Sequence, residues 1–425
     1  PRRDEFFTRY RSDFRSLKPD EKEEAQEKLL ENEEIQNSWE EYKRNFEIRS
    51  TYFTESSDYS LQWGEIDGRT RTGRNELSML FLERVFEISH DDAYVQQLLP
   101  GKIFRSGTCK NLRLHLLNET TIRSIAVFEN KGIFQNIDNR QTFGILNFKN
   151  SGESTEFPAI FMQRDTEVLS EFYQKAVWLR RKTLEEYSPE AITFPFVRSQ
   201  DELNVLETIL QHPNANDNDG WSANPYIEIY TIDSDYFTES KADADYPVYG
   251  GSNMYQFIYN SDYFDLEEPK YWSVEEDVNP DKSAKRRVRE KNMSILKKEI
   301  YSQFGGDETS KSKKGFVNDL LREHRGEPLK LNDVKLDCTD YRIVFRCITK
   351  STNERTFVAS MIPPGIICYH ALTTIRPFRF NPKEEDLSNE HLHSAYDKHL
   401  SDRESFALLG LLNSIPFDFL MRTKI

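Results

Sequence analysis

Three arginines and one asparagine lie close together between residues 341 and 364, in the sequence YRIVFRCITKSTNERTFVASMIPP. Arginine presents a planar fork of N–H donors, and the asparagine amide presents a donor beside an acceptor. Such groups can bind base edges and phosphates. Surface arginines are common, so the segment could equally be a hairpin whose arginines are only solvated or paired with acids. The residues that we predict to contact DNA are Arg342, Arg346, Asn353 and Arg355.

The same segment carries the signals of a β-hairpin. Residues 341–348 alternate in polarity and are rich in β-branched and aromatic side chains, which favours a strand. The tetrapeptide Ser-Thr-Asn-Glu at 351–354 is typical of a turn, and residues 356–362 favour a second strand. A hairpin would bring the four polar residues onto one short element.

A second candidate for DNA contact is a basic segment. Residues 281–325 contain 13 Lys and Arg against 7 Asp and Glu, whereas the whole chain has a net charge of −15. A basic region in an acidic chain is typical of a protein that touches DNA on one face, although a solvated helix face has the same composition. We predict a helix over 283–301 that follows the phosphate backbone with Lys285, Arg286, Arg287 and Arg289.

An aromatic-rich segment over 246–259 surrounds Gly250 and Gly251. Paired glycines would let the backbone approach a ligand closely, and Tyr255 and Gln256 are the candidate contacts there. A glycine turn inside a packed β segment is an equal alternative. Three histidines near the end of the chain (391, 393 and 399) lack the spacing of zinc ligands, so we predict no metal site.

Helices and strands alternate in the first part of the chain, which predicts an α/β fold. The order, ending in what reads as an antiparallel pair, is typical of the latter half of a Rossmann-like methyltransferase sheet. The predicted elements are a helix at 75–88, a buried strand at 102–104, a helix at 109–118, and strands at 121–128 and 142–148.

Three ordered stretches carry a family resemblance. Residues 248–272, VYGGSNMYQFIYNSDYFDLEEPKYW, resemble an "L-Y-x-G-K-M-x-x-Q-F … P-R-Y-W" segment, and residues 408–424, LLGLLNSIPFDFLMRTK, resemble a closing "L-L-A-L-L-N-S" helix. Between them, the hairpin supplies R-x-x-x-R, N-E-R-T and I-P-P. Together they resemble the second half of large adenine-N6 DNA methyltransferases, namely type IIG restriction-modification enzymes and phage-defence methylases of the BREX and DISARM kind.

A fourth stretch resembles the same family. Residues 128–150, from Phe-Glu-Asn to TFGILNFKN, are similar to its "F-E-N-x-K-G-I-F … F-A-L-L-x-F" segment, which gives the target base an aromatic face. Such enzymes flip the adenine out of the duplex and hold it between aromatic and apolar surfaces. The resemblance implies a base pocket of Phe134, Asn136 and Phe143; for Phe143 and Phe148, ordinary sheet packing is the alternative.

Two of the family's motifs are absent from this sequence. It has neither the Gly-rich cofactor loop nor the N-P-P-[YFW] tetrapeptide, since Asn224-Pro225-Tyr226 lacks the second proline, and it begins with Pro1 rather than Met. We therefore expect a fragment, inactive alone, of a site-specific adenine methyltransferase whose S-adenosylmethionine is bound by a missing N-terminal part. A non-enzymatic DNA-specificity or scaffold subunit is the alternative, and an acidic DNA mimic is disfavoured by the arginine-rich hairpin.

The expected organisation has four parts. They are an acidic helical insertion (1–60), the end of a catalytic domain (61–165), a helical connector (166–225) and an α+β target-recognition domain (226–425). The expected partners are double-stranded DNA and further defence-system subunits. The sequence has no run of 18 apolar residues and no signal peptide, so we expect no membrane association. Its four cysteines form no C-x-x-C pair, which predicts a reducing cytoplasm.

Overall fold

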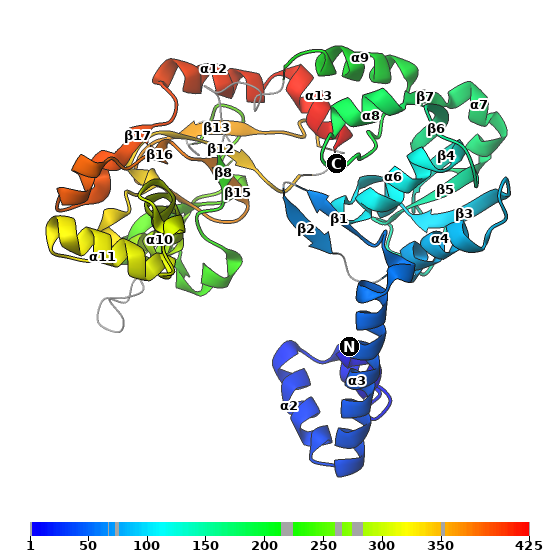
Figure 1. The fold of residues 1–425 in the computed structure, drawn as a ribbon, viewed down its shortest axis with the longest axis horizontal. Helices are drawn as coiled ribbons and strands as arrows, with labels where there is room; N and C mark the ends of the chain where they lie inside the picture. The colour runs from blue at the N-terminus through cyan, green and yellow to red at the C-terminus, as the bar shows by residue number, and fades with distance from the viewer. Residues whose placement is uncertain are drawn as a thin grey trace. The chain divides into compact units, whose positions relative to one another are not determined.

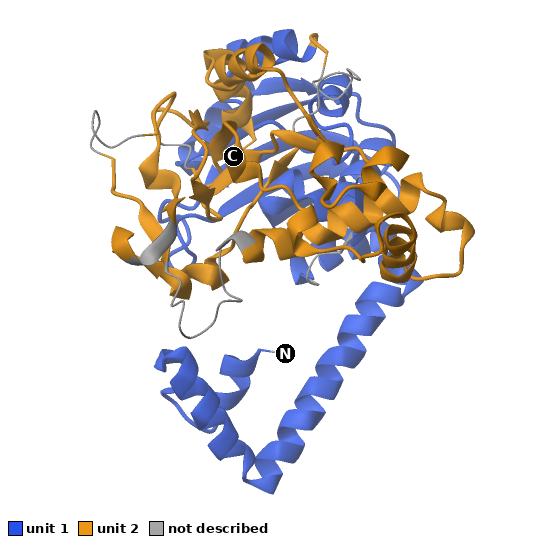
Figure 2. Ribbon diagram, turned by 90° about the vertical axis from the view of Figure 1, so that its left-hand side faces the viewer, with its two compact units in different colours: residues 1–210 blue, residues 211–425 orange. Residues whose placement is uncertain are grey.

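The computed structural model describes residues 2–66, 68–72, 76–213, 224–259, 266–273, 284–349 and 353–424. The chain is a mixed α/β protein with several sheets (Figure 1). It divides into two compact units, Pro1–Leu210 and Gln211–Ile425 (Figure 2), each with its own sheets and hydrophobic clusters. Among the described residues, no helix is long and apolar enough to cross a membrane.

The first unit is built on a five-stranded sheet in the order β3-β5-β4-β6-β7. Strand β5 is antiparallel to both β3 and β4, so those two run parallel, while β6 is parallel to β4 and β7 is antiparallel to β6. The strands are β3 (Tyr94–Pro100), β4 (Thr121–Glu129), β5 (Thr142–Lys149), β6 (Glu156–Gln163) and β7 (Val177–Arg180).

Helices connect and flank these strands (Figure 1). The predicted strand at 102–104 is wrong, because these residues form the short helix α5, in which Ile103 and Phe104 are fully buried. A short apolar run cannot distinguish a buried helix from a buried strand. The helices are α4 (Leu77–Ile88), α5 (Lys102–Arg105), α6 (Lys110–Asn118), α7 (Phe172–Lys175), α8 (Arg181–Tyr187) and α9 (Gln200–Leu210).

The start of the chain folds into helices α1 (Arg3–Phe7), α2 (Pro19–Leu30) and α3 (Glu33–Glu55), of which α2 and α3 lie as a hairpin (Figure 2). Asn32 starts α3, since its side chain accepts hydrogen bonds from the backbone N–H groups of Glu34 and Ile35. A separate cluster of Phe6, Phe7, Phe14, Ala25 and Trp39 stabilises this helical part. A two-stranded ribbon follows, β1 (Trp63–Ile66) with β2 (Arg69–Thr72).

The second unit contains two four-stranded sheets, β13-β12-β15-β8 and β14-β10-β11-β9, and the ribbon β16-β17. The predicted hairpin is confirmed as antiparallel β12 and β13, although both strands are shorter than predicted and residues 350–352 of its turn lie outside the described residues. The strands are β8 (Pro225–Tyr226), β9 (Phe237–Thr238), β10 (Ala244–Tyr249), β11 (Lys270–Ser273), β12 (Arg342–Arg346), β13 (Ala359–Ile362), β14 (Ile367–Cys368), β15 (Leu372–Ile375), β16 (Phe378–Phe380) and β17 (Tyr396–Lys398).

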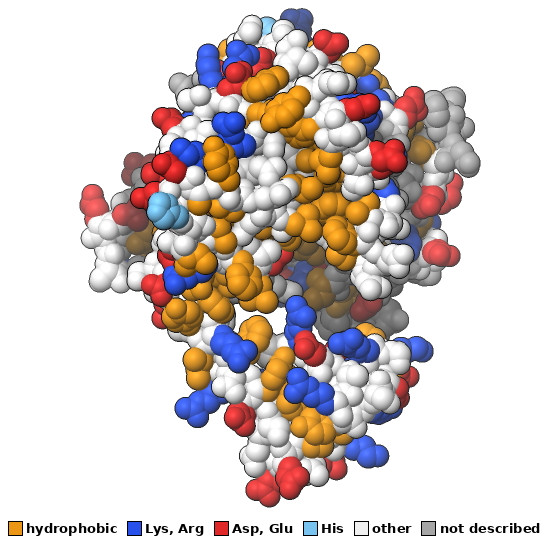
Figure 3. Space-filling view, turned by 90° about the vertical axis from the view of Figure 1, so that its right-hand side faces the viewer, with side chains coloured by type: hydrophobic (Ala, Val, Ile, Leu, Met, Phe, Trp, Pro, Cys, Tyr) orange, Lys and Arg blue, Asp and Glu red, His pale blue; other side chains and the backbone are white. Residues whose placement is uncertain are grey.

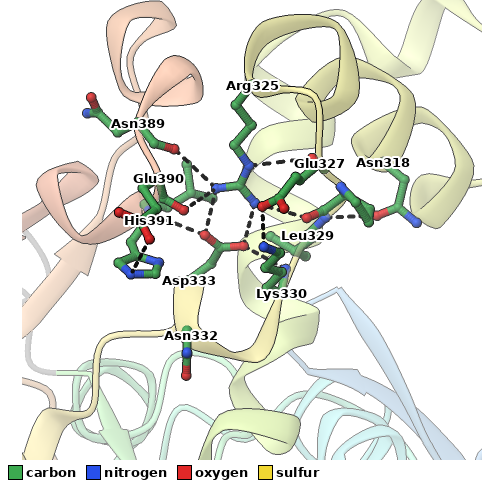
Figure 4. A network of polar contacts seen from close by, with 12 residues as sticks. Asn318, Arg325, Glu327, Leu329, Lys330, Asn332, Asp333, Asn389, Glu390 and His391 are labelled. Carbon is green, nitrogen blue, oxygen red and sulfur yellow. Dashed lines mark hydrogen bonds and ion pairs between the residues drawn. The ribbon is translucent and has the colours of Figure 1, made fainter.

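The described part of the second unit has one helix where the basic helix was predicted, one at 313–325 that was not predicted, and two near the end of the chain, where the resemblance implies a closing helix. They are α10 (Ala284–Gln303), α11 (Lys313–Arg325), α12 (Asp402–Leu412) and α13 (Ile415–Thr423). At the end of α11, Arg325 makes a buried ion pair with Asp333, with two N–O distances of 2.7 Å (Figure 4). Asp333 also accepts from the backbone N–H groups of Lys330 and Leu392, so one carboxylate joins three segments of the unit.

Candidate functional site

An aromatic stack leads from the core of the first unit to the loop between β4 and β5. The rings of Phe128 and Phe143 stack with centroids 5.3 Å apart, and the edge of Phe134 meets Phe143 at 4.8 Å. Phe128 is fully buried, whereas Phe143 and Phe134 are half-buried. The structure therefore brings together two of the three predicted pocket residues and leaves Phe134 at the outer end of the stack.

Asn130 fixes the loop that carries Phe134. Its side chain is fully buried, its Oδ1 accepts from the backbone N–H of Phe134 at 2.8 Å, and its Nδ2 donates to the carbonyl of Ile137 at 2.7 Å. The amide of Asn130 thus supplies hydrogen-bond partners for backbone N–H and C=O groups that have no partner strand in the loop. This role of Asn130 was not predicted, although the residue lies within Phe-Glu-Asn; its place directly after a strand was the available signal.

The other residues near this loop divide into exposed and buried ones. Asn136 is exposed, two residues beyond Phe134. Phe148 is buried and packs edge-on against Phe86 at 5.5 Å, so it is a core residue, as the alternative interpretation held. The buried Glu129 at the end of β4 pairs with Arg164 at 3.1 Å.

Arg342 is placed differently from the prediction. Its side chain is fully buried, and its guanidinium donates to the carboxylate of Glu228 at 3.0 Å and to the carbonyl of Ile366. Burial opposes the charge, but the carboxylate of Glu228 outweighs it and raises the pKa of Arg342. A group without exposed surface cannot reach DNA, so we correct its role to that of a buried ion-pair partner.

The remaining hairpin arginines are half-buried and engaged by their own unit. Arg346 donates to the carbonyl of Met254, and its guanidinium lies 5.6 Å from the ring of Tyr255. Burial lowers the pKa of Arg346. Asn353 is exposed at the described end of the turn, where its amide donates to the hydroxyl of Thr349 at 3.3 Å.

Asn413, at the end of α12, is a meeting point of all three resemblance stretches in this unit. Its side chain bonds both backbone groups of Ala359 in β13, at 3.1 and 3.0 Å, and its carbonyl accepts from Arg355. The amide of Gln256, 157 residues away, lies 3.4 Å from that of Asn413 and 3.1 Å from the guanidinium of Arg355. Gln256 and Arg355 were predicted as DNA contacts, whereas no role was predicted for Asn413.

Phe257 was not predicted as a site residue. It has a backbone φ of 62°, which side chains other than glycine rarely adopt, and its side chain is 59% exposed. Its N–H donates to the carbonyl of Ala359 at 3.1 Å, and Tyr255 and Ile258 close the turn around it. The surrounding contacts therefore hold an exposed ring in a strained turn, which no local sequence signal indicated.

The paired glycines nearby have different environments. A Cβ on Gly250 would overlap the ring of Tyr369, whereas a Cβ on Gly251 would meet nothing closer than 3.9 Å. Packing therefore explains Gly250, in agreement with the alternative interpretation of a turn in a packed segment.

The basic helix is confirmed as α10, and three of its four predicted DNA-contacting residues have partners in the same unit. Arg286 pairs with Glu290 at 2.9 Å, and Arg287 pairs with Asp233 at 3.0 Å. Arg289 donates to the side chain of Asn332 at 2.7 Å. The side chain of Lys285 lies outside the described residues. An exposed pair such as Arg286–Glu290 contributes only about 0–1 kcal/mol, so a phosphate could replace Glu290, whereas Asp233, the partner of Arg287, is buried.

Comparison with known proteins gives only distant structural neighbours. No protein-family model matches the chain, and no curated protein matches it. One similar solved structure is the type IIL restriction-modification enzyme MmeI in complex with DNA, with 8% identity, coverage of 79% of this chain and 43% of that chain, and a TM-score of 0.38. A second is the type ISP restriction-modification enzyme LlaGI (a nuclease-deletion mutant) in complex with a DNA substrate mimic, with 11% identity, coverage of 80% and 33%, and a TM-score of 0.34. A third is the type IIG restriction endonuclease BpuSI, with 13% identity, coverage of 81% and 44%, and a TM-score of 0.28.

The chain spans less than half the length of these three restriction enzymes. At such low identities and TM-scores, the likeness does not establish a shared fold.

The buried ion pair yields a prediction about Arg342. Arg342→Met should lower the free energy of unfolding by about 3–5 kcal/mol, because it leaves the carboxylate of Glu228 buried without its cationic partner. Denaturant unfolding would measure this, and adding Glu228→Gln should recover part of the loss. In the control Arg286→Met, loss of the exposed pair should cost no more than about 1 kcal/mol. Unchanged stability with lost DNA binding would restore Arg342 as a DNA contact.

Proposed function

We propose that this chain supplies the base pocket and the DNA-recognition part of a site-specific adenine-N6 DNA methyltransferase that uses S-adenosylmethionine in restriction-modification or phage defence. The observation that carries the proposal is the meeting of three motif stretches at Asn413. Gln256, the hairpin residues Arg355 and Ala359, and the closing helix are far apart in sequence but contact one another. The three stretches that resemble the family therefore contact one another around Asn413, and this contact supports treating them as parts of one motif.

The first unit supports the proposal through its sheet. Strands β4 and β5 form an antiparallel pair, as the sequence predicted for these two segments, and β5 also pairs antiparallel with β3, which was not predicted. Ligands of open α/β sheets bind at the carboxyl ends of the parallel strands. The loop that carries Phe134 begins at that end of β4, directly after Glu129.

In the proposed reaction, this chain holds the target base and does not hold the cofactor. S-adenosylmethionine would supply the methyl group, and the sequence offers no Gly-rich turn for it, so another polypeptide segment must bind it. Phe134 would stack on the extruded adenine, and the amide of Asn130 would keep the ring in place by fixing its backbone. Arg346, Arg355 and Tyr255 would line the DNA-facing side of the second unit.

The direct test is methylome sequencing of a host that expresses this chain together with its cofactor-binding segment. The proposal expects N6-methyladenine at one position of one recognition sequence. Sequence-specific DNA binding without any methylation would instead favour the non-enzymatic specificity or scaffold subunit. Neither binding nor methylation would overturn both functions.

The base pocket yields a prediction about Phe134. Phe134→Ala should slow methyl transfer in the assembled enzyme and leave duplex affinity nearly unchanged, because stacking is worth about 1–3 kcal/mol per base. Phe134→Trp should retain more activity than Phe134→Ala. A fluorescent base analogue at the target position should stay bright in Phe134→Ala, since the flipped base then lacks its aromatic partner. Methylation at the wild-type rate by Phe134→Ala would assign the ring to packing alone.

The strained turn yields a prediction about Phe257. Phe257→Gly should raise the free energy of unfolding by about 1 kcal/mol, because glycine adopts a positive φ without strain. The same variant should weaken DNA binding by about 1–3 kcal/mol if the exposed ring stacks on a base. Phe406→Ala is the matched control, since Phe406 is 62% exposed in the same unit and should leave DNA affinity unchanged. Wild-type affinity in Phe257→Gly would exclude a DNA contact for this ring.

A further inference from the structure

A pocket of about 590 Å³ in the second unit is lined by residues of α10 and of strands β8, β12 and β15. Phe345 of β12 and Thr373 of β15 lie opposite each other in the sheet, and both line the pocket. Tyr230, which follows β8, and Lys291 of α10 line it as well. Sites for small molecules in proteins have volumes of about 300–1,000 Å³. The pocket is therefore large enough for a small ligand.

Three buried carboxylates lie close to this pocket, and each is paired with one arginine of the same unit. The pairs are Glu228 with Arg342, Asp233 with Arg287 and Asp337 with Arg376, each at an N–O distance of 3.0 Å. On the face of the molecule drawn in Figure 3, Lys and Arg side chains are likewise interspersed with Asp and Glu side chains. Lys291 differs, because among the described residues no carboxylate forms an ion pair with its ammonium. The pocket thus contains a cation whose charge no neighbouring acid balances.

The ammonium of Lys291 is half-buried and retains a donor for a ligand. It donates to the backbone carbonyl of Ile227 and, at 3.3 Å, to that of Glu228. An ammonium has three N–H donors, so one remains. Burial is the main cause that lowers the pKa of Lys291, and the nearby charge of Arg376 lowers it further. A bound anion would oppose both effects, because it stabilises the charged form of the lysine.

Aromatic rings and a guanidinium plane lie around this charge. The ammonium of Lys291 is 4.2 Å from the ring centroid of Tyr230, whose side chain is 49% exposed. The guanidinium of Arg376 is 3.7 Å from the ring centroid of Tyr226, and it donates to the side chain of Asn292 at 2.8 Å. Nucleobases stack on aromatic rings and on guanidinium planes. The lining therefore combines a cation with flat surfaces that suit a nucleobase.

We propose that the pocket binds a nucleoside phosphate, with the phosphate at Lys291 and the base on the aromatic wall that includes Tyr230. A phosphate supplies both the missing negative charge and an acceptor for the remaining N–H. Ser294 and Thr373 line the same pocket, and their hydroxyl groups can donate to phosphate or sugar oxygens. The ligand is a free nucleotide or a nucleotide of a DNA strand, since both present the same two groups. The inference goes beyond the proposed function, because it requires neither methyl transfer nor a recognition sequence.

The test measures the binding of adenosine monophosphate (AMP), adenosine and inorganic phosphate to the whole chain by titration calorimetry. AMP should bind at least about tenfold more tightly than either of the other two, because only AMP contacts both parts of the pocket. Lys291→Met should lower the affinity for AMP by about tenfold or more and leave that for adenosine unchanged, since it removes a hydrogen bond between charged groups. The matched control is Lys297→Met, which alters a lysine of the same helix that does not line the pocket and should leave AMP binding unchanged.

The ring of Tyr230 provides a second readout. Tyr230→Ala should lower the affinity for AMP by about fivefold or more and leave that for phosphate unchanged, whereas Tyr230→Phe should retain AMP binding. The exposed ring contributes little to the core, so this variant should fold normally. A single-stranded oligodeoxyadenylate distinguishes the two sources: competition with AMP indicates a nucleotide of a strand, and no competition indicates a free nucleotide. AMP that binds no more tightly than phosphate, or an AMP affinity that Tyr230→Ala or folded Lys291→Met leaves unchanged, would overturn the proposal.

Discussion

The arrangement of the two four-stranded sheets in the second unit depends on the hydrogen bonds to the carboxylate of Glu228. This carboxylate is almost fully buried, and it accepts hydrogen bonds from Arg342 of β12 at 3.0 Å, from the backbone of Cys368 in β14 at 2.6 Å and from the hydroxyl of Tyr226 in β8 at 3.2 Å. Strands β12 and β8 belong to one sheet and β14 belongs to the other. A buried charge requires close partners, so the two sheets must keep the separation that lets these three groups reach one carboxylate.

Three buried asparagines hold neighbouring backbone segments in place through side-chain hydrogen bonds. Asn130 fixes the loop of Phe134, and Asn413 fixes β13. Asn253 accepts from the N–H of Gly250 and donates to the carbonyl of Glu267, both at 2.7 Å. Each lies within a stretch that carries the family resemblance, in Phe-Glu-Asn, Gly-Gly-Ser-Asn or Leu-Leu-Asn-Ser. The motif asparagines thus set the backbone, while the neighbouring Phe134 and Phe257 keep exposed surface for contacts.

The elements that could be predicted are those with strong local patterns. Strands β4 and β5, helices α6 and α10 and the hairpin were expected from the residue patterns of their segments, although burial alternates along β5 and not along β4. Strands β3 and β6 were missed, since β3 has an exposed apolar face and β6 is buried along most of its length, so neither alternates cleanly. The role of Arg342 depends on Glu228, which is 114 residues away, and the strain at Phe257 depends on its contact with Ala359. Local sequence contains neither relation.

Burial also decides which cations of this acidic chain remain available to a phosphate backbone. Arg342 and Arg325 have side chains that are at most 3% exposed, and each is sealed against a carboxylate, so exchanging that partner for a phosphate would leave a buried negative charge uncompensated. Arg286 pairs with a half-exposed glutamate, and water already screens that attraction, so a phosphate can replace the partner at little cost. Arg287 is intermediate, because it is 53% exposed itself but its partner Asp233 is only 5% exposed. The density of arginines along the sequence is therefore a poor guide to DNA contact, and the exposure of each acidic partner is the physical quantity that separates the structural arginines from the available ones.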